Sequence, residues 1–122
     1  MTTHKDLIVW QKAMNFVLAI YKATKLFPND EVFGLTSQMR RAAVSIPSNI
    51  AEGFGRFHLR ERENFLSISL GSACELETQL ILSKDLGYIS LDEVEQLMID
   101  IQSIIKMLTG LIKSLGDRKS VV

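Results

Sequence analysis

Apolar residues recur every three or four positions along most of the chain, and this spacing restricts the possible folds more than any other feature of the sequence. Such a period is typical of amphipathic helices, and the alternation at every second residue that marks half-buried strands is nearly absent. Clusters of glycine, proline and polar residues interrupt the pattern at residues 27–30, 53–55 and 86–90. We therefore expect an all-α fold, an antiparallel up-down four-helix bundle.

The length of the chain fits one such bundle. With 122 residues, of which 47% are hydrophobic, the chain can build one core, but it is too short for an enzyme with a cleft between two domains. We expect residues 1–122 to form a single domain with a frayed tail over 116–122. Ser90 followed by Glu93 predicts a capped start for the last helix, whose single apolar stripe indicates that it faces one core.

Charge and cysteine content exclude several other classes of protein. The 14 basic and 14 acidic side chains cancel, which argues against a protein that coats nucleic acid through its total charge. Cys74 is the only cysteine, so neither an intrachain disulfide nor a cysteine zinc site can form. No apolar run reaches the roughly 18 residues of a membrane span, and the start lacks a secretion signal. We expect a soluble, cytoplasmic protein without a membrane partner.

The first helix carries more apolar surface than an ordinary surface helix needs. One stripe consists of Leu7, Trp10, Met14, Val17, Leu18 and Tyr21, and a second stripe beside it consists of Val9, Ala13, Phe16 and Ile20. Together they span roughly 200° of the helix circumference. We interpret this width as contact with both the bundle and a second subunit, and we assign the second stripe to the oligomer interface. The alternative is that this helix is simply the most central one.

The second helix, expected from Glu31 to about Glu52, has an apolar stripe and a polar column side by side. The apolar stripe consists of Leu35, Met39, Ala42, Ala43, Ile46 and Ile50, and the polar column consists of Gln38, Arg41, Ser45, Asn49 and Glu52. We interpret the column as a structural polar ladder at a helix or subunit seam. A binding groove contacted by Arg41, Asn49 and Glu52, or a solvated face, are the alternatives. Pro47 lacks an N–H, so we expect this helix to be interrupted near Pro47.

The third helix, expected over roughly residues 58–86, contains a run of small residues. Gly71 lies in the middle of the helix, where a glycine costs about 1 kcal/mol against alanine, so we expect it to mark the close approach of another backbone. Cys74 has no activating base nearby in the sequence, and we expect it to be a small buried hydrophobic residue.

The sequence contains no recognisable catalytic or cofactor-binding motif. Residues 53–55 follow a helix, so they predict a helix end and not a dinucleotide-binding turn. His4 and His58 lie near helix starts, and no Glu-x-x-His pair of the kind that binds metals in bundles is present. We expect no enzymatic activity, no cofactor, no metal and no small-molecule substrate.

Charge is unevenly distributed along the chain despite the zero total. Residues 38–62 contain five arginines and two glutamates. Residues 63–100 contain eight acidic residues and one basic residue, Lys84, and the last segment is basic again. Candidate contacts for nucleic acid or another partner are Arg40, Arg56, Arg60 and Arg62. Phe57 and His58 add surfaces on which bases can stack. Pairing between subunits and a solvated face are the alternatives.

Several segments resemble one family of helical proteins. The longest is QMRRAAVSIPSNIAEG at residues 38–53; shorter ones are LIVWQ at 7–11, FP at 27–28, FGL at 33–35, GSACE at 71–75 and LGY at 86–88. On these residues the chain resembles the 23S rRNA intervening-sequence proteins, which are named for genes inside insertions of bacterial 23S ribosomal RNA. The resemblance implies an antiparallel four-helix bundle that assembles into a five-fold ring and has no known catalytic activity. A similar protein, the accessory protein of diversity-generating retroelements, uses a basic ring to bind nucleic acid and a reverse transcriptase.

These observations lead to two functional hypotheses. The first is a non-enzymatic assembly scaffold, a homo-oligomer that the resemblance specifies as a pentamer, with itself as its main partner. The second is an accessory module that binds RNA or DNA through its arginine-rich rim. The zero net charge of the chain favours the first hypothesis.

Overall fold

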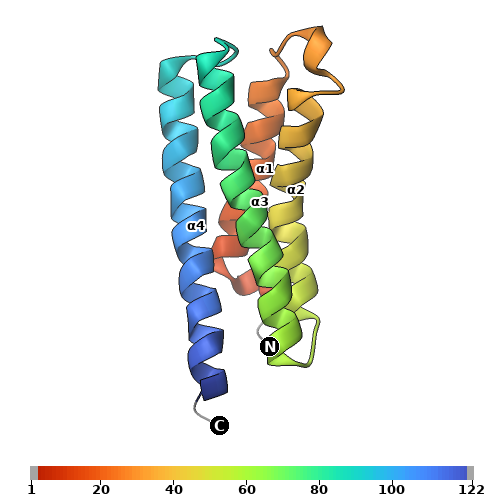
Figure 1. Cartoon of the computed structure of the whole chain (residues 1–122), viewed down its shortest axis with the longest axis vertical. Coiled ribbons are helices and arrows are strands. Elements are labelled where there is room, and N and C mark those ends of the chain that lie inside the picture. The colour runs from red at the N-terminus through yellow and green to blue at the C-terminus, as the bar shows by residue number, and fades with distance from the viewer. Residues whose placement is uncertain (1–2, 121–122) are drawn as a thin grey trace.

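The computed structural model describes residues 3–120, with side chains through Asp117, and the regular secondary structure of this part is helical. Within this part of the chain four α-helices form, α1 (Ile8–Thr24), α2 (Leu35–Phe54), α3 (Leu59–Asp85) and α4 (Leu91–Ser120), together with two short 3-10 turns, η1 (His4–Asp6) and η2 (Asn29–Glu31). The helices run up and down in turn and pack α1 on α2, α2 on α3, α3 on α4 and α4 on α1 (Figure 1). The predicted all-α antiparallel bundle is confirmed.

The core lies along the axis of the bundle and receives one stripe from each helix. Its fully enclosed large side chains are Ile20 of α1, Met39, Ile46 and Ile50 of α2, Leu66, Leu76 and Leu80 of α3, and Ile101, Ile104 and Leu108 of α4. The stripe predicted for the second helix is confirmed, with Leu35 at its half-buried end. Among the helices of the described residues, none could span a membrane.

The α3–α4 connection is closed by local hydrogen bonds. Gly87 adopts φ of +77°, the left-handed conformation that favours glycine. Its N–H donates to the Lys84 carbonyl at 3.0 Å, and the Tyr88 N–H donates to the Ser83 carbonyl at 2.9 Å, which is the Schellman pattern of a helix end. The Ser90 hydroxyl then accepts the Glu93 N–H at 3.2 Å. The predicted cap at the start of the last helix is therefore present.

The predicted interruption near Pro47 is wrong, because α2 continues through this residue. Pro47 is buried, and the two carbonyls just before it accept hydrogen bonds from side chains. The Ser69 hydroxyl of α3 donates to the Ile46 carbonyl at 2.8 Å, and the Asn49 amide donates to the Ser45 carbonyl at 2.8 Å. The segment thus stays helical with added side-chain bonds next to Pro47, although the Ala43 carbonyl lacks its usual backbone partner.

The start of α2 and the end of α4 also differ from the prediction. Glu31 does not lie inside α2; its carboxylate accepts the Leu35 N–H at 3.0 Å, so it caps the helix from four residues upstream. The last helix continues to Ser120, into the segment expected to be frayed, and residues 121–122 lie outside the described residues.

Two predictions for the third helix are wrong as well. A Cβ added at Gly71 would meet nothing within 4 Å, so no backbone among the described residues of the other helices approaches this glycine. The close approach occurs instead at Gly53, where a Cβ would lie 3.2 Å from the Arg62 carbonyl oxygen and 3.2 Å from the Cβ of Phe65. Cys74 is exposed and not buried.

Candidate functional site

The outer side of α1 carries an uncovered apolar row. Met14, Leu18 and Tyr21 follow one another at helical spacing, and all three are exposed, Leu18 to 69%. Half-buried Trp10 and Val17 lie beside them. Helix α1 therefore has more apolar circumference than the bundle covers, as its sequence predicts.

The assignment of the two stripes of α1 is reversed relative to the prediction. Val9, Ala13, Phe16 and Ile20, which were expected at an oligomer interface, are at most 5% exposed and form part of the core of this chain. That assignment is wrong, because α2 and α4 both pack on this side of α1. The exposed surface comes from the stripe that was expected to face the bundle.

A groove of about 630 Å³ extends the apolar row of α1 onto α2. The lining residues are Tyr21, Val32, Thr36, Ser37, Arg40, Arg41, Val44 and Ser45. Its charged side chains are arginines. We call this surface the α1–α2 groove.

A second groove, of about 550 Å³, lies between the end of α3 and the start of α4. Its lining residues are Ile81, Lys84, Leu91, Val94, Glu95, Met98, Ile99 and Gln102. Ile81, Leu91 and Ile99 are exposed large hydrophobic residues. This α3–α4 groove was not predicted from the sequence, although Leu91 and Ile99 are apolar residues outside the apolar stripe of the fourth helix.

The polar column of α2 lies partly along the seam with α3. The Ser45 and Ser72 hydroxyls are 2.8 Å apart, and the Asn49 amide also donates to the Ser45 hydroxyl at 2.9 Å. Glu52 pairs with Arg56 at 3.3 Å on the surface. Gln38 and Arg41 line a shallow space of about 140 Å³ at the same seam. The structure thus joins Ser45 and Asn49 in one network and leaves Gln38 and Arg41 exposed.

Two of the four candidate contact arginines cap helices. Arg40 donates to the Thr24 hydroxyl at 2.9 Å and to the Tyr21 carbonyl at 3.3 Å, at the end of α1. Its guanidinium lies 4.6 Å from the centre of the Tyr21 ring. Arg62 donates to the carbonyls of Gly53 and Phe54 at the end of α2 and to that of Arg56 just after it. These arginines satisfy carbonyl groups that the helix ends leave free.

Arg40 is also remote from the other three arginines. It lies in the second turn of α2, and Arg56, Arg60 and Arg62 follow the other end of that helix, roughly 20 Å away at 1.5 Å per residue. At that end Phe57 is 99% exposed, and His58 and Arg60 are exposed as well. Arg56 lies over the Phe65 ring at 4.7 Å. The structure groups three of the four arginines at one end of the bundle and separates Arg40 from them.

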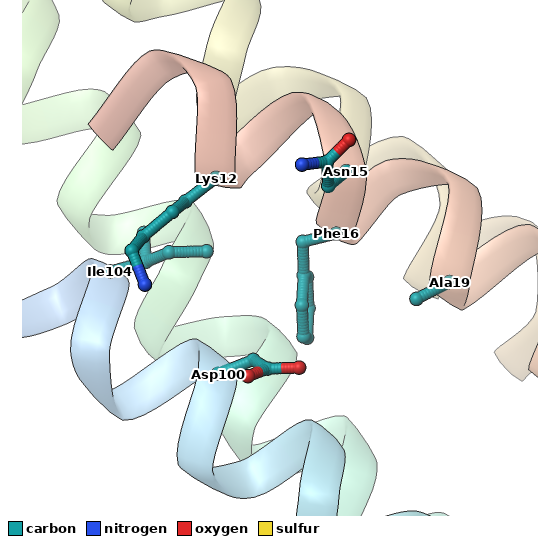
Figure 2. A pocket seen from close by; sticks show the side chains of 6 residues that line it. All are labelled: Lys12, Asn15, Phe16, Ala19, Asp100 and Ile104. Carbon is teal, nitrogen blue, oxygen red and sulfur yellow. The ribbon is translucent and has the colours of Figure 1, made fainter. Parts of the chain in front are cut away.

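A smaller groove of about 220 Å³ lies between α1 and α4. Figure 2 shows Lys12 and Asn15 on α1 and Asp100 on α4 around the space next to Phe16. The volume is below the roughly 300 Å³ at which small-molecule pockets usually begin.

Two side chains with shifted pKa values, Glu31 and Tyr88, lie at the opposite end of the bundle from Phe57. The Tyr88 hydroxyl donates to Glu31 at 2.8 Å. The pKa of Glu31 is lowered, first by the Leu35 N–H and then by the Tyr88 hydroxyl, because both bonds favour the carboxylate. The pKa of Tyr88 is raised by the same bond. This pair ties η2 to the α3–α4 connection. No group of three metal-binding side chains occurs among the described residues.

Comparisons with known proteins agree with this architecture. Residues 5–110 match the family model described as 23S rRNA-intervening sequence protein. A similar solved structure is the 1.70 Å crystal structure of a protein with unknown function from the S23 ribosomal protein family of Bacteroides thetaiotaomicron VPI-5482. It has 29% sequence identity and a TM-score of 0.79, and the match covers 87% of this chain and 99% of that chain. No curated protein matches the chain.

Proposed function

Because the chain belongs to the 23S rRNA-intervening sequence protein family, whose function is unknown, we propose that it is a non-enzymatic scaffold that assembles into a ring-like homo-oligomer, a pentamer. The observation that carries this proposal is the uncovered apolar row of Met14, Leu18 and Tyr21 on α1. Contiguous apolar surface of this kind is typical of sites that contact another protein.

The oligomeric state tests the proposal directly. Native mass spectrometry and light scattering at micromolar concentration should give about five times the chain mass of 13.7 kDa. Leu18→Lys should dissociate the assembly, because it puts a charge into the apolar row. The control is Ile68→Lys, which changes another exposed aliphatic residue, one turn before Ser72 and on the side of α3 that faces α2. A wild-type monomer at these concentrations would refute the proposal.

A second candidate function is nucleic-acid binding at the end of the bundle where α2 meets α3. The supporting observation is the fully exposed Phe57 ring, which follows Arg56 and precedes His58 and Arg60. An aromatic ring among cations suits stacking on single-stranded nucleic acid with phosphate contacts alongside. Arg40 and Arg62 contribute less to this candidate, because both are engaged in helix caps.

The salt dependence of binding separates this candidate from non-specific attraction. Fluorescence anisotropy with single-stranded RNA and DNA should show affinity falling with salt, and Arg60→Ala should reduce the slope by about one unit for each lost phosphate contact. Phe57→Ala should weaken binding with little change in slope. The control is Lys84→Ala, at the other end of the bundle. Binding that does not change with salt, or no binding, would eliminate the candidate.

A further inference from the structure

The α1–α2 groove and the α3–α4 groove lie on opposite sides of the bundle at the same height. The first uses the end of α1 and the first half of α2, and the second uses the end of α3 and the first half of α4; all four meet at one end of the molecule (Figure 1). Since α1 does not pack on α3, nor α2 on α4, the α1–α2 pair and the α3–α4 pair form opposite faces.

The two grooves differ in charge. Arg40 and Arg41 line the α1–α2 groove. No acidic residue lines this groove among the described residues. Arg41 is exposed, and the structure describes no hydrogen bond or ion pair for its guanidinium. The α1–α2 groove is therefore apolar with a basic edge.

The α3–α4 groove has the opposite character. Four acidic residues lie within two helical turns of its hydrophobic residues, and Glu95 is the one in the lining. Glu77 and Asp85 lie one turn before and after Ile81, and Asp92 and Glu95 precede Ile99 on α4. Lys84 is the basic residue in the lining. This groove is apolar with an acidic edge.

We propose that the α1–α2 groove of one copy binds the α3–α4 groove of the next copy, so that the chain associates head to tail. This contact deepens the proposed scaffold function and rests on it. It sets apolar side chains such as Leu18 and Val44 against Ile81 and Ile99, and it places Arg41 near Glu95. Complementary charge at the edges of an apolar contact selects the partner and its orientation.

Pairing of identical faces is disfavoured by the same charges. Two α1–α2 grooves would bring arginines together, and two α3–α4 grooves would bring carboxylates together. Like charges across an interface cost free energy and suppress that pairing. A contact between two different faces leaves a free face on each new copy, so association continues until a ring closes or a filament grows.

The equal height of the grooves favours an assembly in one plane. A copy added through this contact with its axis parallel to the first is not displaced along the bundle direction, whereas a displacement would produce a helical filament. A closed ring further requires a constant turn about the bundle direction from each copy to the next.

Mixing two face-specific variants tests this contact. Val44→Glu should block the α1–α2 groove, because the new charge faces the acidic edge of the partner. Ile99→Glu should block the α3–α4 groove, because it puts a charge into the apolar contact, and two glutamates facing each other keep this pairing blocked when the variants are mixed. Both residues are exposed, Val44 to 40% and Ile99 to 56%, so the fold should be retained. Each variant alone should be a monomer, and an equimolar mixture should give a 1:1 dimer of about twice 13.7 kDa and nothing larger.

The possible results separate the contact from the proposed function. If the wild-type chain is itself a monomer, the scaffold proposal fails and the contact fails with it. If the wild-type chain assembles but either variant alone still forms a dimer, or the mixture gives no dimer, the head-to-tail contact alone is wrong. Ile68→Lys, whose isoleucine is 51% exposed on the α2 side of α3, should assemble like the wild type.

A charge exchange gives an independent check of orientation. Arg41→Glu and Glu95→Arg should each weaken self-association at least tenfold. The double variant should recover most of the loss, because it restores opposite charges across the contact. A double variant weaker than both single variants would overturn the proposed placement of Arg41 near Glu95.

Discussion

Ser69 shows how one side chain supports an irregular place in a neighbouring helix. Its hydroxyl is fully buried and donates to the carbonyl of Ile46, directly before Pro47. Ser69→Ala should lower the free energy of unfolding by about 1–2 kcal/mol, because the Ile46 carbonyl would lose this bond in a buried place. Urea denaturation would measure the change. Ser67→Ala on the exposed side of the same helix is the control, since it shares the gain in helix propensity, and equal effects of both variants would contradict the prediction.

Gly71 offers the opposite case, a residue whose substitution should stabilise the chain. A Cβ there has open space, and the residue lies within α3. Gly71→Ala should raise the free energy of unfolding by about 0.5–1 kcal/mol, because alanine loses less backbone entropy in a helix. Gly53→Ala is the comparison and should destabilise, since its Cβ would press on the Arg62 carbonyl. A loss of stability in Gly71→Ala would contradict the prediction.

At the scale of elements, the bond between Tyr88 and Glu31 connects two loops that are far apart in sequence. The lowered pKa of Glu31 means that its contribution is present above its ordinary value of 4.5 and is lost as the pH falls through the lower folded value. The raised pKa of Tyr88 means that its contribution is present below 10.0 and is lost as the pH rises through the higher folded value. Tyr88→Phe should therefore destabilise most at intermediate pH.

Denaturation of Tyr88→Phe and the wild type across the pH range would show this dependence. The difference in stability between the two proteins should shrink at both extremes of pH. Tyr21→Phe is the matched control, because the Tyr21 hydroxyl makes no hydrogen bond to any of the described residues. A difference between Tyr88→Phe and wild type that is independent of pH would contradict the assignment of the bond to an ionised Glu31.

The elements themselves could be predicted from local patterns. The apolar stripe of α2 and the Ser90 cap of α4 depend on neighbours within one or two turns, and both appear as expected. The break at Pro47 was wrongly predicted because the bond that supports this segment comes from Ser69, 23 residues beyond Ile46. The bond from Arg40 to the Thr24 hydroxyl was not predicted for the same reason, because Thr24 lies 16 residues away. Such contacts become visible only when the helices are placed in space.

At the scale of the whole molecule, the direction in which α1 faces could not be read from its own sequence. An apolar arc of roughly 200° allows either stripe to face inward, and the choice depends on where α2 and α4 pack. The excess of apolar surface was predictable, and the residues that form it, Met14, Leu18 and Tyr21, were not.

If the chain assembles as proposed, its thermal unfolding should depend on protein concentration. Association stabilises the folded state by mass action, so the Tm of the wild type should rise with concentration. The Tm of Leu18→Lys should be constant over the same range. Scanning calorimetry over a hundredfold range of concentration would measure both. A constant Tm in the wild type would contradict coupling between folding and assembly.

The start of α1 and the end of α4 lie at the same end of the bundle, away from the two grooves (Figure 1). An assembly made through those grooves would be two-sided, with every such helix end on one rim and every Gly87 turn on the other. A fluorescent protein fused at either end of the chain would then project from a single side, spaced from the subunit contacts by most of the length of a helix.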